Sequence, residues 1–588
     1  MTDPRSLLAA RLRKAVGAAF GGELSAVDPM VRRSERADYQ ADLAMGLAKS
    51  LKRAPRQVAE AVVANLDLEG VAERVEIAGP GFINFTLAQS FLETALGTLA
   101  QDAALGIVPA ERPERVVVDY SAPNVAKEMH VGHLRSTIIG DALARLLGAL
   151  GHEIIRQNHL GDWGTPFGML IEHLVDVGGA DRSGADAGAD AEADVGELSE
   201  FYRAARAKFD RDPGFAERAR RRVVLLQSGD PQTLALWKKL VDVSKKHFRA
   251  LYQALGVLLG DDDIRAESFY NPMLPDIAAD LERRGIARES DGALCVFVPG
   301  FENRDGEPLP LIVRKQDGGF GYAATDLAAL RYRTQELLAT RLLYVVGTPQ
   351  QQHFAMVFAV ASLAGWLAPP ARAEHVAFGS ILGPDKKMLK TRAGESVRLA
   401  ALIGEAIDRA EAELRARDPD LDADTRRALA AKIGIGALKY ADLANDRIKD
   451  YIFDWERMLA LEGRTGPYLQ YAHARIRSIL RKAAEAGIER AEAPPAIALT
   501  EGAERALGLE LLGFGGAVAD AAESLKPHRL AGYLYDLATA FTKFFESCPV
   551  LRAPDESTRA ARLALCELTA AVLARGLGLL GIEAPERM

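Results

Sequence analysis

A strand, a long helix and a second strand follow one another within residues 115–156, and this order constrains the fold more than any other feature of the chain. Residues 115–120 are a run rich in β-branched side chains, typical of a parallel strand that is buried on both faces. Apolar side chains recur at helical spacing through residues 134–150, and residues 153–156 return to a strand pattern. Such a βαβ unit predicts a Rossmann-like parallel sheet whose ligand lies at the carboxyl end of the first strand.

Length and composition limit the remaining possibilities. The 588 residues exceed what one hydrophobic core supports, and 48% apolar with 26% charged residues is ordinary globular composition. No apolar run could cross a bilayer and no signal-peptide block opens the chain, so we expect a cytoplasmic protein with no membrane partner. Cys295, Cys548 and Cys566 lack the spacing of metal ligands, so we expect no structural zinc and no other protein-bound metal. A net charge of -8 requires any nucleic acid to be met by local basic patches.

Changes of pattern along the chain predict an α/β protein with several domains. The expected parts are an N-terminal α+β domain (1–110), a Rossmann-like domain (111–400), a helical connector (401–459) and an all-α bundle (460–588). We expect residues from about 170 to 300 to be a mostly helical insertion, with a mobile acidic loop at 177–195. Further core strands are expected at 342–347 and 375–379, and only helices beyond about residue 400.

His130-Val131-Gly132-His133 stands at the start of the predicted helix. The two imidazoles are three residues apart, so they share one face, and Gly132 leaves room for a flat base beside them. Imidazoles at a helix N-terminus can donate hydrogen bonds to an α-phosphate. A pair of incidental surface histidines is the alternative. The polar segments at 123–127 and 158–168 favour phosphate chemistry.

A basic loop at residues 383–392, Gly-Pro-Asp-Lys-Lys-Met-Leu-Lys-Thr-Arg, follows a strand pattern. The ammonium groups of Lys387 and Lys390 are suited to hold a departing pyrophosphate. Taken alone, such a loop would be a solvated run of charge. Together with the histidine pair it predicts transfer of an adenylyl group from ATP to the substrate.

These two elements resemble the His-Ile-Gly-His and Lys-Met-Ser-Lys-Ser signatures of class I aminoacyl-tRNA synthetases. Within that class, residues 122–140, 161–164 and 581–587 are similar to the arginyl-tRNA synthetase family, and the resemblance covers nearly the whole chain. Leu389 stands where the signature has serine. Because some members of this family use a lysine just before the first signature, Lys127 is a third candidate for phosphate contacts, and the division of labour among the three lysines stays open.

The resemblance also implies roles for individual residues. The expected catalytic residues are His130, His133, Lys127, Lys387 and Lys390. The residues expected to bind ATP are His130, Gly132, His133, His353, Val376, Lys387 and Lys390. Those expected to bind L-arginine are Asp119, Ser121, Asn124, His133, Tyr322, Asp326 and Gln350.

Independent support for the arginine site is modest. A guanidinium requires planar carboxylate partners in a partly desolvated pocket. Tyr322 and Asp326 are four residues apart, so a helix would present both on one face. A helix-start aspartate and a packed tyrosine explain the same pattern equally well. His353 would face the ATP ribose or fill a structural position.

Contact with tRNA requires basic and aromatic groups on one surface. The residues expected to supply them in one predicted helix and its lead-in are Tyr468, Tyr471, Arg475, Arg477 and Arg481. The resemblance implies that residues 1–110 bind tRNA, that 111–400 form the catalytic domain and that 460–588 bind the anticodon. By resemblance, Phe82 and Asn84 would touch the tRNA elbow. The alternatives are a solvated amphipathic helix and packing at a strand end.

The implied reaction is activation of L-arginine by ATP, with Mg²⁺ accompanying the nucleotide, and transfer of the arginyl group to the 3′-terminal ribose of tRNA(Arg), with release of AMP and pyrophosphate. The resemblance further implies that bound tRNA is needed before activation, and we expect a monomer. Two alternatives remain open: another class I synthetase or small-molecule nucleotidyltransferase, and a catalytically inactive relative that only binds tRNA.

Overall fold

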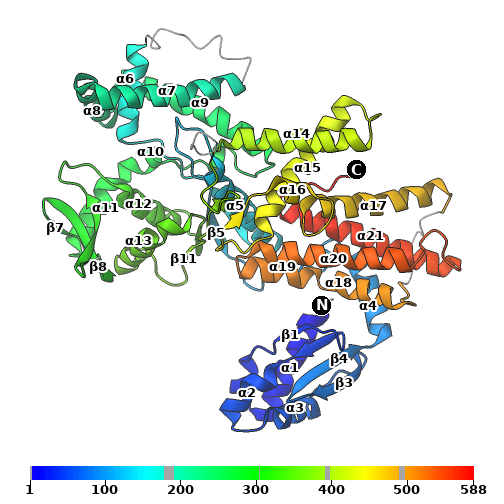
Figure 1. The fold of residues 1–588 in the computed structure, drawn as a ribbon. Coiled ribbons are helices and arrows are strands. Elements are labelled where there is room, and N and C mark those ends of the chain that lie inside the picture. The colour runs from blue at the N-terminus through cyan, green and yellow to red at the C-terminus, as the bar shows by residue number, and fades with distance from the viewer. Residues whose placement is uncertain (1–2, 178–190, 304, 391–396, 489–496) are drawn as a thin grey trace. The chain divides into compact units, whose positions relative to one another are not determined.

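The computed structural model describes residues 3–177, 191–303, 305–390, 397–488 and 497–588, and the chain forms two compact units (Figure 1). One unit consists of residues 111–458. The other joins residues 1–110 to residues 459–588. Residues 401–458, expected to form a connector, therefore belong to the same unit as the parallel sheet.

The 111–458 unit is built on a four-stranded parallel sheet of order β11-β10-β5-β6. Its strands are β5 (Arg115–Asp119), β6 (Glu153–Gln157), β10 (Arg341–Tyr344) and β11 (Arg372–His375). Helix α5 (Val131–Ala149) connects β5 to β6 and covers the sheet. Residues 116–118 are completely buried. A strand buried on both faces has apolar side chains at every position rather than at alternate positions, as this run does. The predicted Rossmann-like βαβ core is confirmed.

The strand expected at residues 375–379 is displaced toward the N-terminus. Strand β11 ends at His375, and Val376 N makes one further hydrogen bond to Tyr344 O (2.8 Å). The chain then leaves the sheet, because Gly379 N bonds to Arg447 O (2.9 Å). The apolar residues beyond His375 are therefore buried without being part of the strand.

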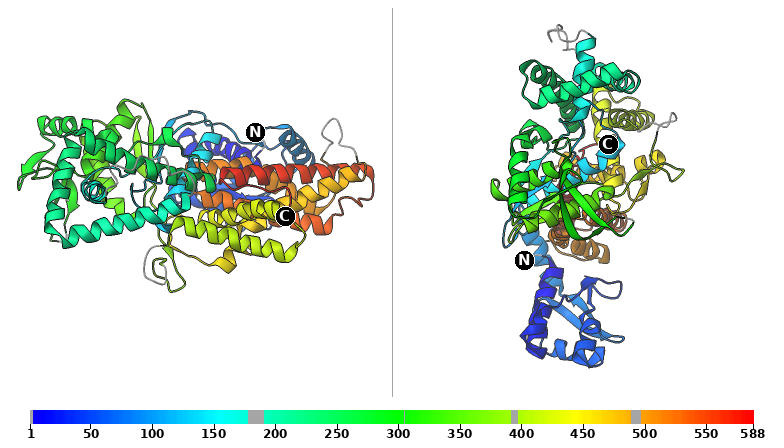
Figure 2. Two further views of the ribbon diagram at one scale, coloured as in Figure 1. Left: turned by 90° about the horizontal axis from the view of Figure 1, so that it is seen from above. Right: turned by 90° about the vertical axis from the view of Figure 1, so that its left-hand side faces the viewer.

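A long insertion separates β6 from β10. Its first part consists of α6 (Thr165–Asp176), α7 (Ala191–Arg211), α8 (Pro213–Gln227) and α9 (Pro231–Ala254), which pack against one another (Figures 1 and 2). Residues 178–190 of the predicted acidic loop lie outside the described residues. Residues 191–195, also expected in that loop, belong instead to α7, because the Gly-Ala-Asp repeats end at Asp190.

The second part of the insertion leads back to the sheet. It contains η2 (Asp261–Asp263), α10 (Glu267–Tyr270), η3 (Asn271–Met273), α11 (Leu274–Arg283), the antiparallel strands β7 (Arg288–Ser290), β8 (Ala293–Glu302) and β9 (Pro308–Arg314), and α12 (Tyr322–Gln335). Strands thus begin before residue 300, where a mostly helical insertion was expected. Between β10 and β11 lie η4 (Thr348–Gln350) and α13 (Gln351–Leu363).

The last elements of this unit are β12 (Ile381–Leu382), α14 (Leu399–Arg417), α15 (Ala423–Leu443), β13 (Tyr451–Ile452) and α16 (Trp455–Leu459). The expectation of helix alone beyond residue 400 is wrong at β13, a two-residue strand that pairs in parallel with β12. Two residues are too few to produce a visible alternation of side chains. The pairing anchors the start of the lysine-containing loop.

A buried ion pair holds α5 against α15. Arg135 and Asp442 are each 1% exposed, and Arg135 Nε lies 3.0 Å from the Asp442 carboxylate. Arg135 also donates to Lys449 O (3.0 Å) and stacks over the Tyr451 ring. The pair therefore ties the histidine-bearing helix to the segment that anchors the lysine-containing loop.

Removing the cation of this pair should strongly destabilise the unit. We expect Arg135→Met to lower the free energy of unfolding by about 3–5 kcal/mol, because Asp442 would remain buried without a counter-ion. Arg409→Met, which breaks an exposed ion pair with Glu405 within α14, is the control and should cost less than about 1 kcal/mol. Urea unfolding followed by circular dichroism measures both, and equal losses would contradict the structural role of the Arg135 pair.

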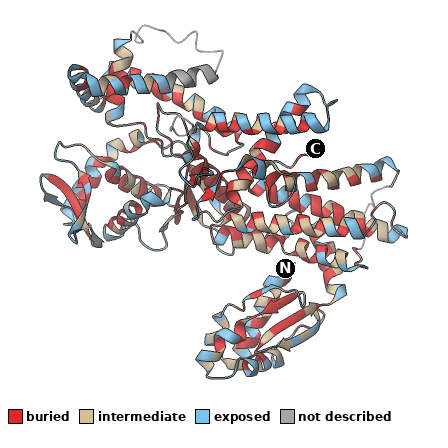
Figure 3. Ribbon diagram, in the orientation of Figure 1, coloured by how far each residue is buried: buried red, intermediate tan, exposed pale blue. Residues whose placement is uncertain are grey.

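The other unit combines an antiparallel sheet of order β1-β2-β4-β3 with a helical bundle. Its N-terminal elements are α1 (Pro4–Phe20), η1 (Gly22–Ala26), β1 (Val31–Arg33), β2 (Tyr39–Ala41), α2 (Leu43–Leu51), α3 (Pro55–Ala64), β3 (Ala72–Ala78), β4 (Phe82–Leu87) and α4 (Gln89–Gln101). The bundle contains α17 (Gly466–Glu485), α18 (Gly502–Leu512), α19 (Phe514–Glu523), α20 (Pro527–Ser547) and α21 (Glu556–Leu579), with buried residues along their inner faces (Figure 3). Among the described helices, none has the length and apolarity needed to cross a membrane.

Candidate active site

The loop after β5 is held in an unusual backbone conformation. Ser121, Ala122 and Ala126 have positive φ angles of 73°, 47° and 62°, a region that residues with a side chain rarely adopt. Two hydrogen bonds hold the loop in this conformation. Ala122 N donates to Asn158 Oδ1 (3.1 Å), and Ala126 N donates to Ser244 Oγ (3.0 Å). Such strain at the carboxyl end of a central parallel strand is typical of a ligand-binding loop.

The two histidines cap α5 and fix each other. His130 N donates to His133 Nδ1 (3.1 Å), Gly132 N donates to His130 Nδ1 (3.0 Å), and the ring centroids lie 4.1 Å apart. Because both Nδ1 atoms accept hydrogen bonds, each neutral ring carries its proton on Nε2. The pair therefore presents two Nε2–H donors at the N-terminus of a helix, as phosphate binding requires.

Both histidines should be neutral at pH 7. Burial, together with the neighbouring His130, lowers the pKa of His133 from 6.5 to about 4, and burial together with Lys127 lowers the pKa of His130. Folding thus favours the neutral rings, so their contribution to stability is present above pH 6.5 and is lost as the pH falls from 6.5 toward 4. In ¹H–¹⁵N spectra of histidine-labelled protein we expect His133, assigned with His133→Asn, to show a neutral Nε2–H ring at pH 6. A protonated ring at that pH would contradict the account.

Two glycines allow close approaches within the site. A Cβ on Gly132 would lie 2.7 Å from Cε1 of His130, so this glycine makes room for the histidine ring itself. A Cβ on Gly161 would lie 2.3 Å from Oδ1 of Asn124, and Val125 N donates to Gly161 O (2.9 Å). Gly161 therefore lets the loop after β6 pack directly against the loop after β5.

The histidine segment and the residues after the lysine-containing loop are joined through their backbones. Val131 N donates to Val397 O and Leu399 N donates to Met129 O, both at 2.9 Å. Arg398 Nε lies 2.9 Å from the Glu128 carboxylate. The histidine segment therefore lies directly beside the residues that follow the lysine-containing loop in the chain.

The lysine-containing loop itself is a hairpin that begins at β12. Gly383 N donates to Lys387 O (2.8 Å) and Leu389 N to Ile381 O (3.1 Å), while Lys387 and Lys390 are exposed. Leu389 thus contributes a backbone contact where the family signature has serine. Thr391 and Arg392, the end of the predicted basic element, lie outside the described residues.

Asp119, expected to bind arginine, is already paired with an arginine of the chain. Its Oδ2 accepts from Nη2 of Arg333 (2.8 Å), a completely buried residue that also donates to Gln157 (2.7 Å) and lies over the Tyr344 ring. Oδ1 of Asp119 is buried and has no hydrogen-bond partner among the described residues. One carboxylate oxygen is therefore available to a ligand, but most of the charge of Asp119 is neutralised internally.

Tyr322 and Asp326 lie one turn apart in α12, as the spacing predicts. Tyr322 is the first residue of the helix and is 76% exposed. Asp326 Oδ2 lies 2.6 Å from Nε2 of His353, the first-turn histidine of α13. His353, expected at the ATP ribose, is thus in direct contact with a residue expected to bind arginine.

Glu267 joins this group and was not identified from the sequence. Burial, then Asp162 and Asp326, raises its pKa from 4.5 to about 8, and Glu267 in turn contributes to the raised pKa of Tyr322. No arginine or lysine of the described chain forms an ion pair with Glu267. The sequence carries no signal for it, because residues 261–263 just before it are three aspartates that resemble a solvated acidic run.

The remaining expected ligands are distributed around the same strand ends. Ser121 is buried, with its hydroxyl bonded to Tyr252 (2.8 Å) and Thr137 (2.9 Å). Asn124, Lys127 and Gln350 are exposed, and Val376 is completely buried. Tyr252 and Asn158, which hold the Ser121–Ala122 turn, are further site residues that residue spacing could not reveal, because they come from distant parts of the chain.

In the other unit, Phe82 and Asn84 lie on the same face of the antiparallel sheet. Asn84 is 6% exposed, and its Oδ1 accepts from Gln40 (2.8 Å), whose Oε1 accepts from Arg32 (2.7 Å). These three residues are paired neighbours across β1, β2 and β4. Asn84 is therefore buried within a polar row, while Phe82 is half-buried.

The five residues expected on one tRNA-binding surface of α17 divide between two faces. At about 100° per residue, Tyr468, Tyr471 and Arg475 share one face and Arg477 and Arg481 lie on the opposite one. The first face meets α20: Tyr468 packs near Tyr535 (5.6 Å between ring centroids) and Arg475 over Phe545 (4.3 Å). On the other face, Arg477 and Arg481 bind Glu586 of the C-terminal segment (2.6 and 2.9 Å). The sequence analysis places these five residues on one surface, but the structure places them on two opposite faces of α17.

Comparison with known proteins assigns the fold to a class. The model of the catalytic domain of class I tRNA synthetases (R) matches residues 96–455, the DALR anticodon-binding domain matches 469–588, and the arginyl-tRNA synthetase N-terminal domain matches 5–87. The chain is a class I aminoacyl-tRNA synthetase, with the predicted parallel-sheet core, N-terminal domain and helical C-terminal domain.

Comparison with individual proteins identifies the family within this class. The chain is 53% identical to the arginine–tRNA ligase of Thermobifida fusca over all of both chains, and 52% identical to that of Frankia casuarinae over 96% of each. The arginyl-tRNA synthetase structures of Plasmodium falciparum (29% identity) and Thermus thermophilus (27%) each give a TM-score of 0.82, cover 99% of this chain, and are themselves covered to 99% and 100%. The chain belongs to the arginyl-tRNA synthetase family, which consists of ATP-dependent arginine–tRNA ligases, and the expected activity is confirmed.

Proposed function

We propose that L-arginine binds at the carboxyl end of β5 with its guanidinium between Glu267, Asp326 and Tyr322, and that the phosphates of ATP lie against His130, Gly132 and His133. Asp119, through its unpartnered Oδ1, is suited to the α-amine of the substrate. Asn124, Ser121 and Gln350 supply the remaining polar contacts. The completely buried Val376 supports the backbone beside the adenosine, through its hydrogen bond to Tyr344 O. His353 orients Asp326.

The observation that carries this proposal is the acidic group around Glu267. A half-buried carboxyl whose pKa is raised to about 8 beside Asp162 and Asp326 is an unfavourable arrangement in the free protein. A bound guanidinium would relieve it, because planar carboxylates and a planar cation form paired charge-assisted hydrogen bonds. A neutral side chain or a compact ammonium would satisfy the group less well.

In the first half-reaction, the α-carboxylate of arginine attacks the α-phosphorus of ATP in line with the leaving pyrophosphate. The two neutral histidines donate from Nε2 to the α-phosphate oxygens as their charge builds. Lys127, Lys387 and Lys390, with the Mg²⁺ that arrives on ATP, neutralise the leaving pyrophosphate. Within the described residues, no three His, Cys, Asp or Glu side chains gather as a metal site. The chain supplies positioning and charge rather than a nucleophile.

In the second half-reaction, the arginyl group passes to the 2′-hydroxyl of the terminal ribose of tRNA(Arg), with release of AMP. The elbow of the tRNA meets the sheet face that carries Phe82 and Asn84, next to Arg32, an exposed guanidinium that pairs with Asp42 (3.1 Å). The anticodon meets the part of this α17 face that α20 leaves open, where Tyr471 is exposed and Tyr468 and Arg475 are half-buried. Aromatic rings and guanidinium planes together suit unpaired bases. Arg477 and Arg481 can contact phosphates only if their hydrogen bonds to Glu586 break.

The remaining features follow the family resemblance: activation of arginine that depends on bound tRNA, action as a monomer, and a cytoplasmic location. The direct test is charging of tRNA with labelled arginine by the wild type, His133→Ala and Asp326→Ala, with exchange of pyrophosphate into ATP measured for each of the twenty amino acids. We expect arginine alone to support exchange, only with tRNA present, and both variants to be severely slowed. Unchanged charging by both variants would contradict the site assignment.

A further inference from the structure

We propose that Tyr202, on the inserted helix α7, is a positioning residue for adenylate formation, which holds the ammonium group of Lys127 in place beside His130 and His133. This inference rests on the proposed phosphate role of Lys127. It gives the inserted helices a part in the chemistry that neither the family match nor the signature motifs assign to them.

The contact between the two side chains is direct. Lys127 Nζ lies 5.1 Å from the centroid of the Tyr202 ring, within the range of a cation–π interaction. Lys127 is exposed, and its flexible four-carbon chain would otherwise sample many rotamers. Tyr202 is half-buried, so its ring is the better ordered partner. The aromatic face therefore restricts where the ammonium group can lie.

The ammonium group also acts on both histidines. Lys127 precedes His130 by three residues, and its positive charge contributes to the lowered pKa of each ring. An anionic ligand held by the two Nε2–H donors is therefore attracted by this ammonium group as well. Fixing Lys127 by an aromatic ring, rather than by a carboxylate, leaves its full charge available to a phosphate.

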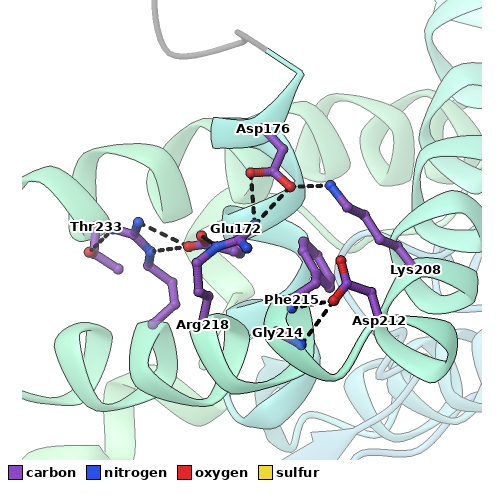
Figure 4. A network of polar contacts seen from close by, with 9 residues as sticks. Glu172, Asp176, Lys208, Asp212, Gly214, Phe215, Arg218 and Thr233 are labelled. Atoms are coloured by element: carbon purple, nitrogen blue, oxygen red, sulfur yellow. Dashed lines mark hydrogen bonds and ion pairs between the residues drawn. The ribbon is translucent and has the colours of Figure 1, made fainter.

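Helix α7 is held firmly enough to act as a support. Lys208 of α7 forms an ion pair with Asp176 of α6, and Arg218 of α8 bonds both Asp176 (3.0 Å) and Glu172 (2.7 Å), as Figure 4 shows. Asp212 caps the start of α8 through Gly214 N and Phe215 N. Ala205, one turn from Tyr202, is completely buried. The ring is thus presented by a packed helix rather than by a loose segment.

The rest of the insertion supports the same loop. Helix α9 contributes Ser244 Oγ, which accepts from Ala126 N (3.0 Å), and Tyr252, whose hydroxyl contacts Ser121 Oγ (2.8 Å). Trp237 of α9 donates to Asp162 O (2.8 Å) in the loop after β6. The backbone that leads into Lys127 and the side chain of Lys127 are therefore both restrained by inserted helices.

Five variants test the inference in the full-length protein with tRNA present. We expect Tyr202→Leu to slow adenylate formation about threefold to tenfold, with KM for arginine unchanged within about twofold, because only the phosphate contact is disturbed. Tyr202→Phe keeps the aromatic face and should retain the wild-type rate. Phe209→Leu removes another ring of α7, which stacks with Arg206 and Arg220 away from Lys127, and should also be normal. Lys127→Met should be at least about tenfold slower, and Lys127→Met/Tyr202→Leu no slower than Lys127→Met alone.

Two outcomes distinguish a failure of the proposed function from a failure of this inference alone. A normal rate for Lys127→Met would remove the proposed phosphate role of this lysine, and the inference with it. A slow Lys127→Met together with a normal Tyr202→Leu, an equally slow Tyr202→Phe, or strictly multiplicative effects in the double variant would overturn the inference while leaving the proposed function intact. Thermal melting of each variant checks that α7 remains folded.

Discussion

Replacing Glu267 with glutamine is expected to lower kcat/KM for arginine on the order of a hundredfold, mainly through a higher KM. The substitution keeps the size of the side chain but removes the charge, so one charge-assisted pair of hydrogen bonds to the guanidinium is lost. Steady-state charging of tRNA at varied arginine concentration measures the effect. Glu114→Gln is a matched control, since Glu114 precedes the amino end of β5, far along the strand from the proposed pocket, and pairs with Arg372; its KM for arginine should be unchanged.

The same residue predicts a pH dependence. In the free protein the pKa of Glu267 is raised to about 8, so the carboxyl is mostly protonated at pH 7, and arginine must displace that proton to bind. KM for arginine should therefore fall as the pH rises from about 6 to about 8.5, and Glu267→Gln should flatten this dependence. A wild-type KM that is constant over this range, or a variant within twofold of the wild type, would rule out Glu267 as a guanidinium partner.

Replacing His133 with asparagine is expected to slow adenylate formation about 100-fold to 1000-fold while leaving stability nearly unchanged. The asparagine oxygen can take the place of Nδ1 and accept from His130 N, so the helix cap survives. The Nε2–H donor is lost, and a donor aimed at developing phosphate charge contributes this much to a rate. Rapid-quench measurement of arginyl-adenylate with tRNA present gives the rate, and thermal melting gives the stability.

His152 supplies the control for this experiment. Its Nδ1 accepts from Glu114 N (3.0 Å) and its pKa is also lowered by burial, but it lies just before β6, at the opposite end of the strands from the site. His152→Asn should therefore leave the rate of adenylate formation unchanged. A His133→Asn rate within threefold of the wild type, or similar losses in both variants, would show that the histidine cap is only structural.

The core of the fold was predictable because it is encoded locally. Completely buried strands such as residues 116–118 read as unbroken β-branched runs, and the helix between them has caps at both ends. Strands that depend on distant partners were not predictable. β13 exists because Tyr451 and Ile452 pair with β12 some seventy residues earlier in the chain, and β11 ends early because Gly379 bonds to Arg447.

The site shows the same division between local and distant information. His130, His133 and the lysines were identified because motif spacing on one helix or loop is visible in the sequence. Glu267 and Tyr252 were missed because each becomes significant only when the insertion folds back on the strand ends. The two faces of α17 could have been predicted from the sequence. Arg477 lies six residues after Tyr471, and this separation places the two side chains on different faces of a helix.

The central claim is that one pocket at the carboxyl end of β5 both selects arginine and activates it. A crystal structure of the protein with tRNA and a non-hydrolysable arginyl-adenylate analogue tests this most directly. The account predicts the guanidinium in contact with the carboxylates of Glu267 and Asp326, and the phosphate replacement within hydrogen-bonding distance of Nε2 of His130 and His133. A guanidinium bound to other residues, or a phosphate replacement away from both histidines, would contradict it.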